Sequence, residues 1–310
     1  MSLLHVGRYA SLILVLLGNG LAVEAVDATA PMELRHNMPF VQVMMNQQGP
    51  FTFGIDTGTG GESLVSPDLA RKLHLPSVGE ATVGDPSGSN AQRVPLFRIE
   101  SLTVAGITFR NITGVQYQPS PREGECDGVL GFTLFRDYLL TLDYPRKQLV
   151  LSSGSLAQDG NGNVVSFSMP DNVPLIELQI GGRRIGAHID SRGMGLSLPQ
   201  SFAKDLKFVS DPIVLGRGRT VSSDFEIKGA QLASDIELAG YTFARPFIEI
   251  NPVFPVANFG AIPLQNFAVT FDQKNGLVRF VAKDRTIMIA PPRMMPAPPS
   301  QSEAATQPKS

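Results

Sequence analysis

Two short segments place an aspartate between an apolar run and a glycine-containing turn. The segments are Gly54–Thr59 and His188–Gly193, and their aspartates, Asp56 and Asp190, lie 134 residues apart. Two carboxyl groups held about 3 Å apart cannot both ionise cheaply, so they share one proton. The ionised group can then activate water as a general base while its protonated partner donates to a substrate carbonyl. This chemistry hydrolyses a peptide bond, and it requires no metal or other cofactor.

The residues that follow each aspartate suit the same chemistry. Glycine at position 58 lets main-chain N–H groups approach a carboxylate closely. Thr57 and Ser191 directly follow the two aspartates, and their hydroxyls can form hydrogen bonds across the two loops. We therefore expect these side chains to hold the two carboxyl groups in a fixed arrangement.

The elements around these loops occur twice along the chain. Gly106–Phe109 matches Gly240–Phe243 at the same offset of 134, and Gly131–Asp143 matches Gly260–Asp272 at an offset of 129. Three matched blocks in one order predict an internal duplication, with five residues lost from the second copy. We expect the halves to span 33–152 and 163–283, joined by a polar, glycine-rich linker around residues 158–163.

Each half reads mainly as β-strand, because short apolar runs alternate with turn-forming residues. The 30 glycines and 24 prolines favour many turns and short strands. Turn signals at 145–147 and 274–276 predict hairpins. Short helices are predicted over Ser66–Leu73 and Pro199–Leu206. We interpret Gly216–Arg219 as a loop in a hairpin flap, for which Val83–Gly88 would be the first-half counterpart.

Together these motifs resemble those of the retropepsin- and pepsin-like aspartic proteases. The resemblance rests on Phe53–Thr59 followed by Gly128–Gly131, and bacterial family members with two retropepsin-like halves in one chain are the most similar kind. It implies a mainly β, bilobal fold of closed barrels with short helices. It also implies that Asp56 and Asp190 are the catalytic pair. The supporting positions that it implies are Thr57, Gly58, Thr59, Ser191, Arg192 and Gly193.

The second motif departs from the family pattern at Arg192, which stands where the first motif has Gly58. If its guanidinium lies near Asp190, it favours the charged form of that carboxyl, and Asp56 becomes the carrier of the shared proton. Alternatively the backbone shifts, so that Gly193 takes the role of the glycine and Arg192 points to solvent or contacts the substrate.

Two function classes therefore remain open. The first is an exported aspartic endopeptidase that acts as a monomer on peptide or protein substrates. The second is a degenerate, non-catalytic member of the fold that binds peptides, and two departures favour it: Arg192, and Asn258–Gly260 where the first half has Val129–Gly131. A weaker third alternative is a structural envelope protein whose proline-rich tail recruits a partner. Inhibition by a statine compound together with cleavage would separate the first two classes.

Composition argues against several other classes. The net charge of −2 and isoelectric point near 6.1 do not favour a nucleic-acid binder. The single cysteine, Cys126, excludes an intrachain disulfide and is interpreted as an inert thiol. His36, His74 and His188 lack the spacing of metal ligands, so we interpret them as structural or surface residues.

The two ends of the chain read differently from the body. Residues 1–25 are typical of a signal peptide, with Arg8, the apolar run Leu12–Leu17 and the cleavage signal Val23–Ala25. A membrane anchor is the alternative, but the apolar run is too short to span a bilayer about 30 Å thick. No cysteine lies directly after that run, so a lipoprotein is not indicated. We expect a periplasmic or secreted protein without a stable membrane span after cleavage, and a disordered, proline-rich tail over 290–310.

Overall fold

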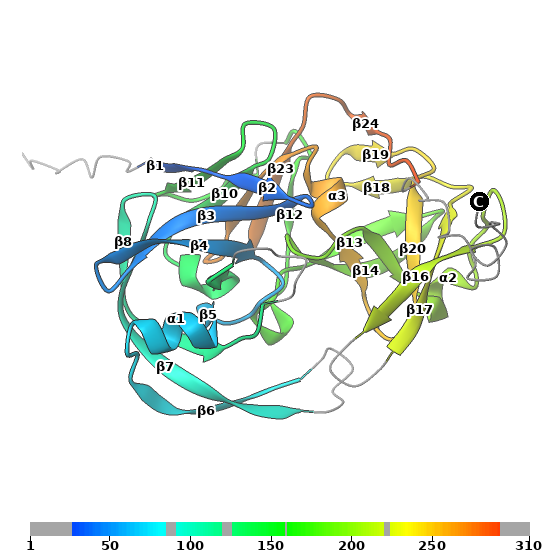
Figure 1. Ribbon diagram of the computed structural model, residues 1–310. Coiled ribbons are helices and arrows are strands. Elements are labelled where there is room, and N and C mark those ends of the chain that lie inside the picture. The colour runs from blue at the N-terminus through cyan, green and yellow to red at the C-terminus, as the bar shows by residue number, and fades with distance from the viewer. Residues whose placement is uncertain (1–26, 85–90, 120–125, 159, 220–223, 292–310) are drawn as a thin grey trace, which may run out of the picture.

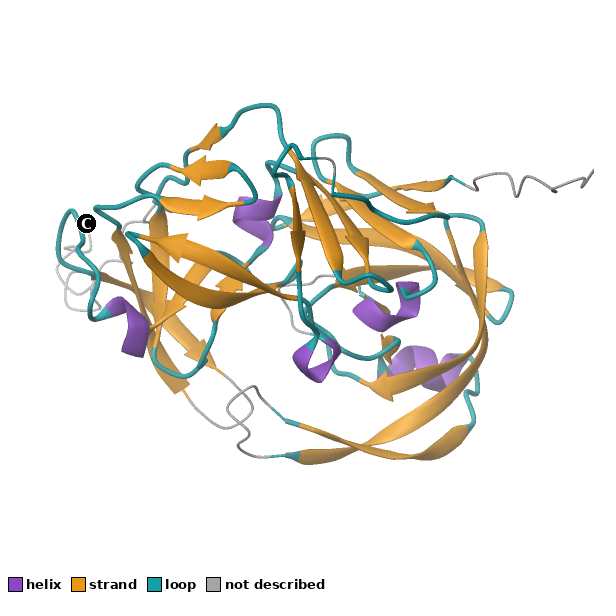
Figure 2. Ribbon diagram, turned by 180° about the vertical axis from the view of Figure 1, so that it is seen from behind, coloured by secondary structure: helices purple, strands orange, loops and turns teal. Residues whose placement is uncertain are grey.

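The computed structural model describes residues 27–84, 91–119, 126–158, 160–219 and 224–291 (Figure 1). Its fold is mainly β, as the sequence predicts, and its strands form three sheets. An eight-stranded sheet and a ten-stranded sheet lie side by side, and a six-stranded sheet contains strands from both halves of the sequence (Figures 1 and 2).

The eight-stranded sheet carries the first aspartate and curls into a barrel. Its strand order is β2-β3-β4-β9-β5-β8-β7-β6, and an additional pairing of β3 with β7 closes six of these strands on themselves. The strands are β2 (Glu33–Arg35), β3 (Met38–Met45), β4 (Gln48–Asp56), β5 (Ser63–Val65), β6 (Ser77–Val83), β7 (Gln92–Val104), β8 (Ile107–Gln116) and β9 (Gly128–Gly131).

The ten-stranded sheet carries the second aspartate, in the order β16-β17-β20-β15-β21-β14-β13-β18-β19-β24. In this sheet β19 ends at Phe243 and β20 begins at Phe247. Pro246, which has no N–H to donate, lies in the break between them. The strands are β13 (Leu175–Ile180), β14 (Arg183–Ile189), β15 (Leu196–Pro199), β16 (Ile213–Arg219), β17 (Asp224–Gln231), β18 (Ile236–Leu238), β19 (Tyr241–Phe243), β20 (Phe247–Asn251), β21 (Ala257–Phe259) and β24 (Thr286–Ile287).

The six-stranded sheet joins the two curled sheets. Its order is β1-β11-β10-β22-β23-β12, and its centre is the antiparallel pair β10–β22, where the hydroxyls of Thr141 and Thr270 lie 2.8 Å apart. Both predicted hairpins are present in it, β10–β11 and β22–β23. The strands are β1 (Ala28–Pro31), β10 (Leu139–Asp143), β11 (Gln148–Ser152), β12 (Val164–Ser166), β22 (Ala268–Asp272) and β23 (Leu277–Val281).

The helices are short and lie beside the sheets. Helix α1 (Pro67–Lys72) begins as predicted, because the Ser66 side chain accepts a hydrogen bond from the Leu69 N–H and Pro67 occupies the first turn. Helix α2 (Gln200–Ala203) is shorter than the predicted Pro199–Leu206. Three further short elements are α3 (Ala261–Leu264) and the 3₁₀ turns η2 (Phe132–Phe135) and η3 (Pro170–Asn172).

The apolar core runs continuously from the first barrel through the central sheet to the ten-stranded sheet. At the junction, the Phe132 ring meets those of Phe271 and Phe167 edge to face, with centroids 5.1 and 6.1 Å away. Strands such as β13 alternate buried and exposed positions, as the period-two pattern predicts. The two sheets that carry the aspartates are thus attached to one shared core.

Some sequence expectations need correction, and others lie outside the described residues. Gly216–Arg219 is not a loop: it lies in β16, which pairs with β17 as a hairpin, and Val83 ends β6 in the hairpin β6–β7. The two hairpins extend toward one another along one side of the molecule (Figures 1 and 2). Most of Val83–Gly88, the expected signal peptide over 1–25 and nearly all of the expected tail over 290–310 lie outside the described ranges.

The fold also includes residues beyond the expected limits of the halves. Strand β1 precedes residue 33 and pairs with β11, while β24 follows residue 283 and pairs with β19. In the part of the chain that the structure describes, we find no helix with the length and apolar character needed to cross a bilayer.

Candidate functional site

Each aspartate lies where a strand ends beside a second strand that runs parallel to it. Strand β4 pairs with β9, which aligns Asp56 with Gly131. Strand β14 pairs with β21 in the same way, and the Asp190 N–H donates to the Phe259 carbonyl, 3.1 Å away. The strand ends therefore fix both loops at the interface of the two curled sheets.

Thr57 and Ser191 join the two loops through four hydrogen bonds. The Thr57 N–H donates to Ser191 Oγ, and the Ser191 N–H donates to Thr57 Oγ1, both over 3.0 Å. Each hydroxyl then donates to a main-chain carbonyl of the opposite strand, Thr57 to Ile189 and Ser191 to Ile55, at 2.7 Å. Both side chains are fully buried, so the exchange is shielded from competition by water.

Main-chain N–H groups hold both carboxylates. Asp56 accepts from the Gly58 N–H at 2.8 Å and from the Thr59 hydroxyl at 2.8 Å. Asp190 accepts from the N–H groups of Arg192 and Gly193, at 2.9 and 2.7 Å, through a single oxygen. Arg192 therefore occupies the main-chain position of Gly58, while Gly193 supplies an additional donor.

The two carboxyl groups approach each other beside Gly58. A Cβ atom at Gly58 would lie 2.7 Å from Asp190 Cγ and 3.1 Å from Asp56 Oδ1. These separations are shorter than carbon–carbon or carbon–oxygen contacts in packed proteins, so any side chain at this position would displace a carboxyl group. Glycine is required here by the closeness of the pair rather than by a left-handed backbone.

Asp56 is the carboxyl group of this site whose pKa is raised, to about 7. Burial contributes most because it disfavours the charged form, and the negative charge of Asp190 acts in the same direction. The Arg192 charge and the hydrogen bonds from Thr59 and Gly58 act against them. Because the two groups are close and coupled, the shared proton belongs to the pair, and Asp56 is the carboxyl on which it is favoured.

The Arg192 side chain crosses to the strand that carries Asp56. Its Nη1 atom is buried and lies 2.0 Å from the position that a Cβ atom would take at Gly54, and its guanidinium carbon is 5.3 Å from the centre of the Phe40 ring. The absence of a side chain at Gly54 makes this space. The alternative in which Arg192 points to solvent is therefore wrong, and its charge lowers the pKa of Asp56.

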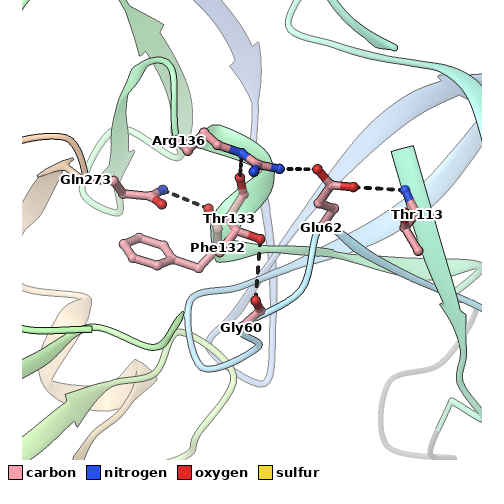
Figure 3. Close-up of polar contacts among 7 residues, drawn as sticks. All are labelled: Gly60, Glu62, Thr113, Phe132, Thr133, Arg136 and Gln273. Atoms are coloured by element: carbon pink, nitrogen blue, oxygen red, sulfur yellow. Dashed lines mark hydrogen bonds and ion pairs between the residues drawn. The ribbon is translucent and has the colours of Figure 1, made fainter. Parts of the chain in front are cut away.

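A network of polar contacts supports the first loop, which follows Asp56 (Figure 3). The Glu62 carboxylate accepts from the Thr113 N–H at 2.9 Å and forms an ion pair with Arg136. Arg136 also donates to the Thr133 carbonyl, and the Thr133 hydroxyl donates to the Gly60 carbonyl. From the second half, Gln273 donates to the Phe132 carbonyl at 2.7 Å. The loop is thus attached to β8 and η2, and η2 is attached to the β22–β23 turn.

Asp56 and Asp190 both line a cleft of about 240 Å³. On the first-half side the wall is apolar, formed by Met38, Leu64 and Val129, with Tyr117 nearby. Arg192 and Gly193 line the other side next to Asp190. The cleft thus brings both aspartates to one solvent-accessible surface.

The remaining candidates do not line this cleft. His36 is an exposed turn residue, His74 is exposed after α1, and the half-buried Cys126 donates to the Gly128 carbonyl at 3.1 Å. His188 is half-buried on β14, and burial lowers its pKa although Asp190 and Asp171 oppose this. Within the described ranges, His, Cys, Asp and Glu side chains form no group of three that could hold a metal ion.

Sequence reasoning missed several residues of the site. Leu64 and Tyr117 line the cleft, while Glu62 and Gln273 support the loop. Leu64 alternates with the buried Ser63 and Val65, a pattern that marks it as facing away from the core. No comparable signal identifies Glu62 or Gln273, because their partners are main-chain groups that are distant in sequence.

Comparison with known proteins finds a family match in the first half of the chain. Residues 41–134 match the family model described as aspartyl protease, a segment that includes Asp56 and the β9 strand beside it. Asp190 lies outside the matched segment. No curated protein matches the chain. Over residues 41–134, the chain is therefore similar to the aspartyl protease family.

Proposed function

We propose that this protein is an exported aspartic endopeptidase, with Asp56 and Asp190 as its catalytic pair. The observation that carries the proposal is the reciprocal exchange of hydrogen bonds between Thr57 and Ser191, beside which the two carboxyl groups meet in one cleft. The match of residues 41–134 to the aspartyl protease family supports the reaction class.

The reaction uses one proton and one water molecule between the two carboxyl groups. Asp56 carries the proton, in agreement with its raised pKa, and Asp190 is ionised and held by two main-chain N–H groups. A water molecule between them loses a proton to Asp190 and attacks the peptide carbonyl carbon. Asp56 donates its proton to the carbonyl oxygen, which gives a neutral tetrahedral intermediate. Asp190 then passes its proton to the nitrogen while Asp56 takes a proton from a hydroxyl of the intermediate, and the C–N bond breaks.

The organisation of the chain follows from the same proposal. The parallel pairings β4–β9 and β14–β21, each with an aspartate at its end, support an internal duplication. Because both aspartates are on one chain, a monomer contains a complete site. The hairpins β6–β7 and β16–β17 are the flaps that cover the substrate, and residues 1–25 direct export.

Asp56→Asn tests the proposal most directly. The amide is nearly the same size as the carboxyl and keeps the fold, but it cannot donate a proton in this step, so kcat should fall by orders of magnitude. Asp137→Asn is the matched control, because Asp137 is an exposed partner of Lys274 and does not line the cleft. Cleavage of unstructured peptides by the mature protein, blocked by a statine compound, is the measurement. A folded Asp56→Asn variant that keeps near-wild-type turnover would exclude the dyad.

A peptide-binding protein without catalysis is the second candidate, and Arg192 is the observation that favours it. A partly buried cation beside the pair stabilises the ionised form of Asp56, which opposes the sharing of one proton. Binding of the statine compound without any peptide cleavage across pH 3–8 would assign this function instead. Cleavage gained by Arg192→Gly would identify Arg192 as the cause.

A further inference from the structure

A row of polar residues crosses four neighbouring strands beside the second aspartate. Ser197 on β15 is directly opposite Glu249 on β20 and also Asn258 on β21, and Asn258 is opposite His188 on β14. Directly opposite residues of neighbouring strands project from the same face of a sheet. These four side chains therefore form one continuous strip, which we call the polar row.

The polar row faces away from the core. Its four members are all half-buried, whereas their neighbours along the same strands are buried among apolar residues. These buried neighbours on the opposite face are Ile189, Leu196, Leu198, Ile248, Ile250 and Phe259. Partial exposure on one face and full burial on the other place the polar row on an accessible surface.

The equivalent row in the first half is apolar. Leu64 on β5 is directly opposite Val115 on β8 and Val129 on β9, and Val129 is opposite Gly54 on β4. Leu64 and Val129 line the cleft beside Asp56. The same strand pairing thus presents two different surfaces, one apolar and one polar, on the two sides of the dyad.

The polar row lies against the loop that follows Asp190. A Cβ atom at Gly193 would lie 2.0 Å from Asn258 Nδ2 and 2.6 Å from Asp190 Oδ2. A Cβ atom at Gly195 would lie 2.7 Å from Glu249 Oε1. Two glycines of this loop thus allow the Asn258 amide and the Glu249 carboxylate to approach, and the Asn258 amide is brought close to the reacting carboxyl.

The Glu249 carboxyl group has no compensating partner among the residues that the structure describes. In the part of the chain that the structure describes, no hydrogen bond or ion pair joins its carboxylate to another residue. Partial burial raises the pKa of Glu249, which means that its ionised form lacks solvation. Val115, at the corresponding place in the first half, needs no such compensation. A cation that enters from outside would supply it.

We propose that the polar row is a substrate subsite for a basic side chain, with Glu249 as its counter-ion and Ser197 and Asn258 as further hydrogen-bonding groups. The preferred peptide then has lysine or arginine on one side of the scissile bond and an apolar residue on the other, against Leu64 and Val129. This inference rests on the proposed function, since it assigns a substrate class to that same site.

A matched peptide panel tests the subsite. Each peptide carries either lysine or norleucine at one of the two positions next to the scissile bond, so that the members of a pair differ mainly in charge. For the wild-type protein, kcat/KM should favour lysine at one of these positions by about tenfold or more, in line with a charged hydrogen bond. Glu249→Gln should remove most of this preference while changing cleavage of the norleucine peptide little.

Three variants make the result specific to the subsite. Glu226→Gln removes a carboxylate from β17 that already pairs with Lys228 outside the row, so the lysine preference should stay at the wild-type value. Glu249→Val installs the first-half residue and should favour norleucine. Glu249→Lys should favour glutamate at the same position. Equal melting temperatures for Glu249→Gln and wild type show that the fold is kept.

The possible outcomes separate this inference from the proposed function. Cleavage without a lysine preference, or a lysine preference that Glu249→Gln keeps, overturns the subsite and leaves the protease assignment intact. If no peptide is cleaved, the proposed function fails, and the subsite is then tested by measuring peptide binding. In that case, the lysine peptide should bind more tightly than the norleucine peptide and lose this advantage in Glu249→Gln. Equal binding of the two peptides overturns the subsite as well.

Discussion

At the scale of single residues, each of the two aspartate loops shapes the surroundings of the aspartate in the other loop. Arg192 occupies the main-chain place of Gly58, yet its guanidinium lies beside Gly54, on the strand that carries Asp56. In return, the missing side chain of Gly58 lets Asp190 approach Asp56. The electrical asymmetry that the sequence suggests is therefore present, but the cation acts on the aspartate of the opposite loop.

Removing the charge of Arg192 should move the alkaline limit of activity. The guanidinium lowers the pKa of Asp56, so its removal raises that pKa further and the shared proton is kept to higher pH. We expect the alkaline limb of the kcat/KM profile of Arg192→Met to shift upward. Arg192→Met is preferred to Arg192→Gly because it fills the space beside Gly54.

Arg192→Lys serves as the control for the charge, because it keeps a cation on a side chain of similar length. Its alkaline limb should stay closer to that of the wild type than the limb of Arg192→Met. If the profiles of wild type and Arg192→Met coincide, the charge of Arg192 does not act on the pair.

Asp56 should also make stability depend on pH. Its pKa rises from 3.8 to about 7 on folding, so the folded protein binds this proton more tightly than the unfolded chain does. The free energy of unfolding therefore falls as pH rises between these values, by an amount on the order of a few kcal/mol. Asp56→Asn lacks this dependence. The melting temperature of the variant minus that of the wild type should therefore increase between pH 4 and pH 8. An advantage that is constant with pH would contradict the raised pKa.

At the scale of elements, the first loop depends on contacts from outside its own strand. Glu62 binds the Thr113 N–H of β8, and the Gly131 N–H donates to the Glu62 carbonyl at 3.0 Å. The second loop has corresponding main-chain contacts, since the Ala261 and Gly260 N–H groups donate to the carbonyls of Gly193 and Gly195. The Glu62 side chain thus adds a contact with β8 to main-chain contacts of a kind that both loops make.

Glu62→Ala should therefore destabilise the first loop. It leaves the partly buried Thr113 N–H and the Arg136 guanidinium without their carboxylate, which should cost about 1–3 kcal/mol of unfolding free energy and lower kcat. Arg136→Ala removes the exposed partner of the ion pair, and it should cost less than about 1 kcal/mol. Denaturant unfolding and peptide cleavage measure the two effects. Equal losses in both variants would show that the ion pair, and not the Thr113 contact, supports the loop.

At the scale of the whole molecule, the central sheet makes the two curled sheets parts of one structure. Strands β10 and β22 are its central pair, and the contact between Phe132 and Phe271 continues the core across it. Neither half can unfold without exposing this shared surface. The dyad is formed at the same interface, so its geometry depends on the two halves staying together.

We therefore expect a single cooperative unfolding transition. Thr270→Val removes the 2.8 Å contact with Thr141 at the centre of the sheet, and should lower stability by about 1 kcal/mol. Native-state hydrogen exchange should show that protection falls together in β4 and β14, which lie in different halves. Loss of protection in only one of these strands, or two separate melting transitions, would show that the halves unfold independently.

The sequence by itself determined the mainly β fold, the two aspartate loops, the start of α1 and the two hairpins of the central sheet. These features depend on local patterns: period-two alternation, Ser66 before Pro67, and turn residues between apolar runs. The exchange between Thr57 and Ser191 was also foreseen, because the residues adjoin the aspartates in both motifs.

Only the tertiary structure decided where the Arg192 charge acts, which residues support the first loop, and that Glu249 lies in the polar row. Each of these depends on which strands become neighbours: β4 opposite the second loop, β8 beside Glu62, and β20 beside β15. The residues involved are distant in sequence, and their partners are often main-chain groups that any residue provides. A pattern of residues along the chain does not predict such contacts, because they arise only when the sheets curl and pack together.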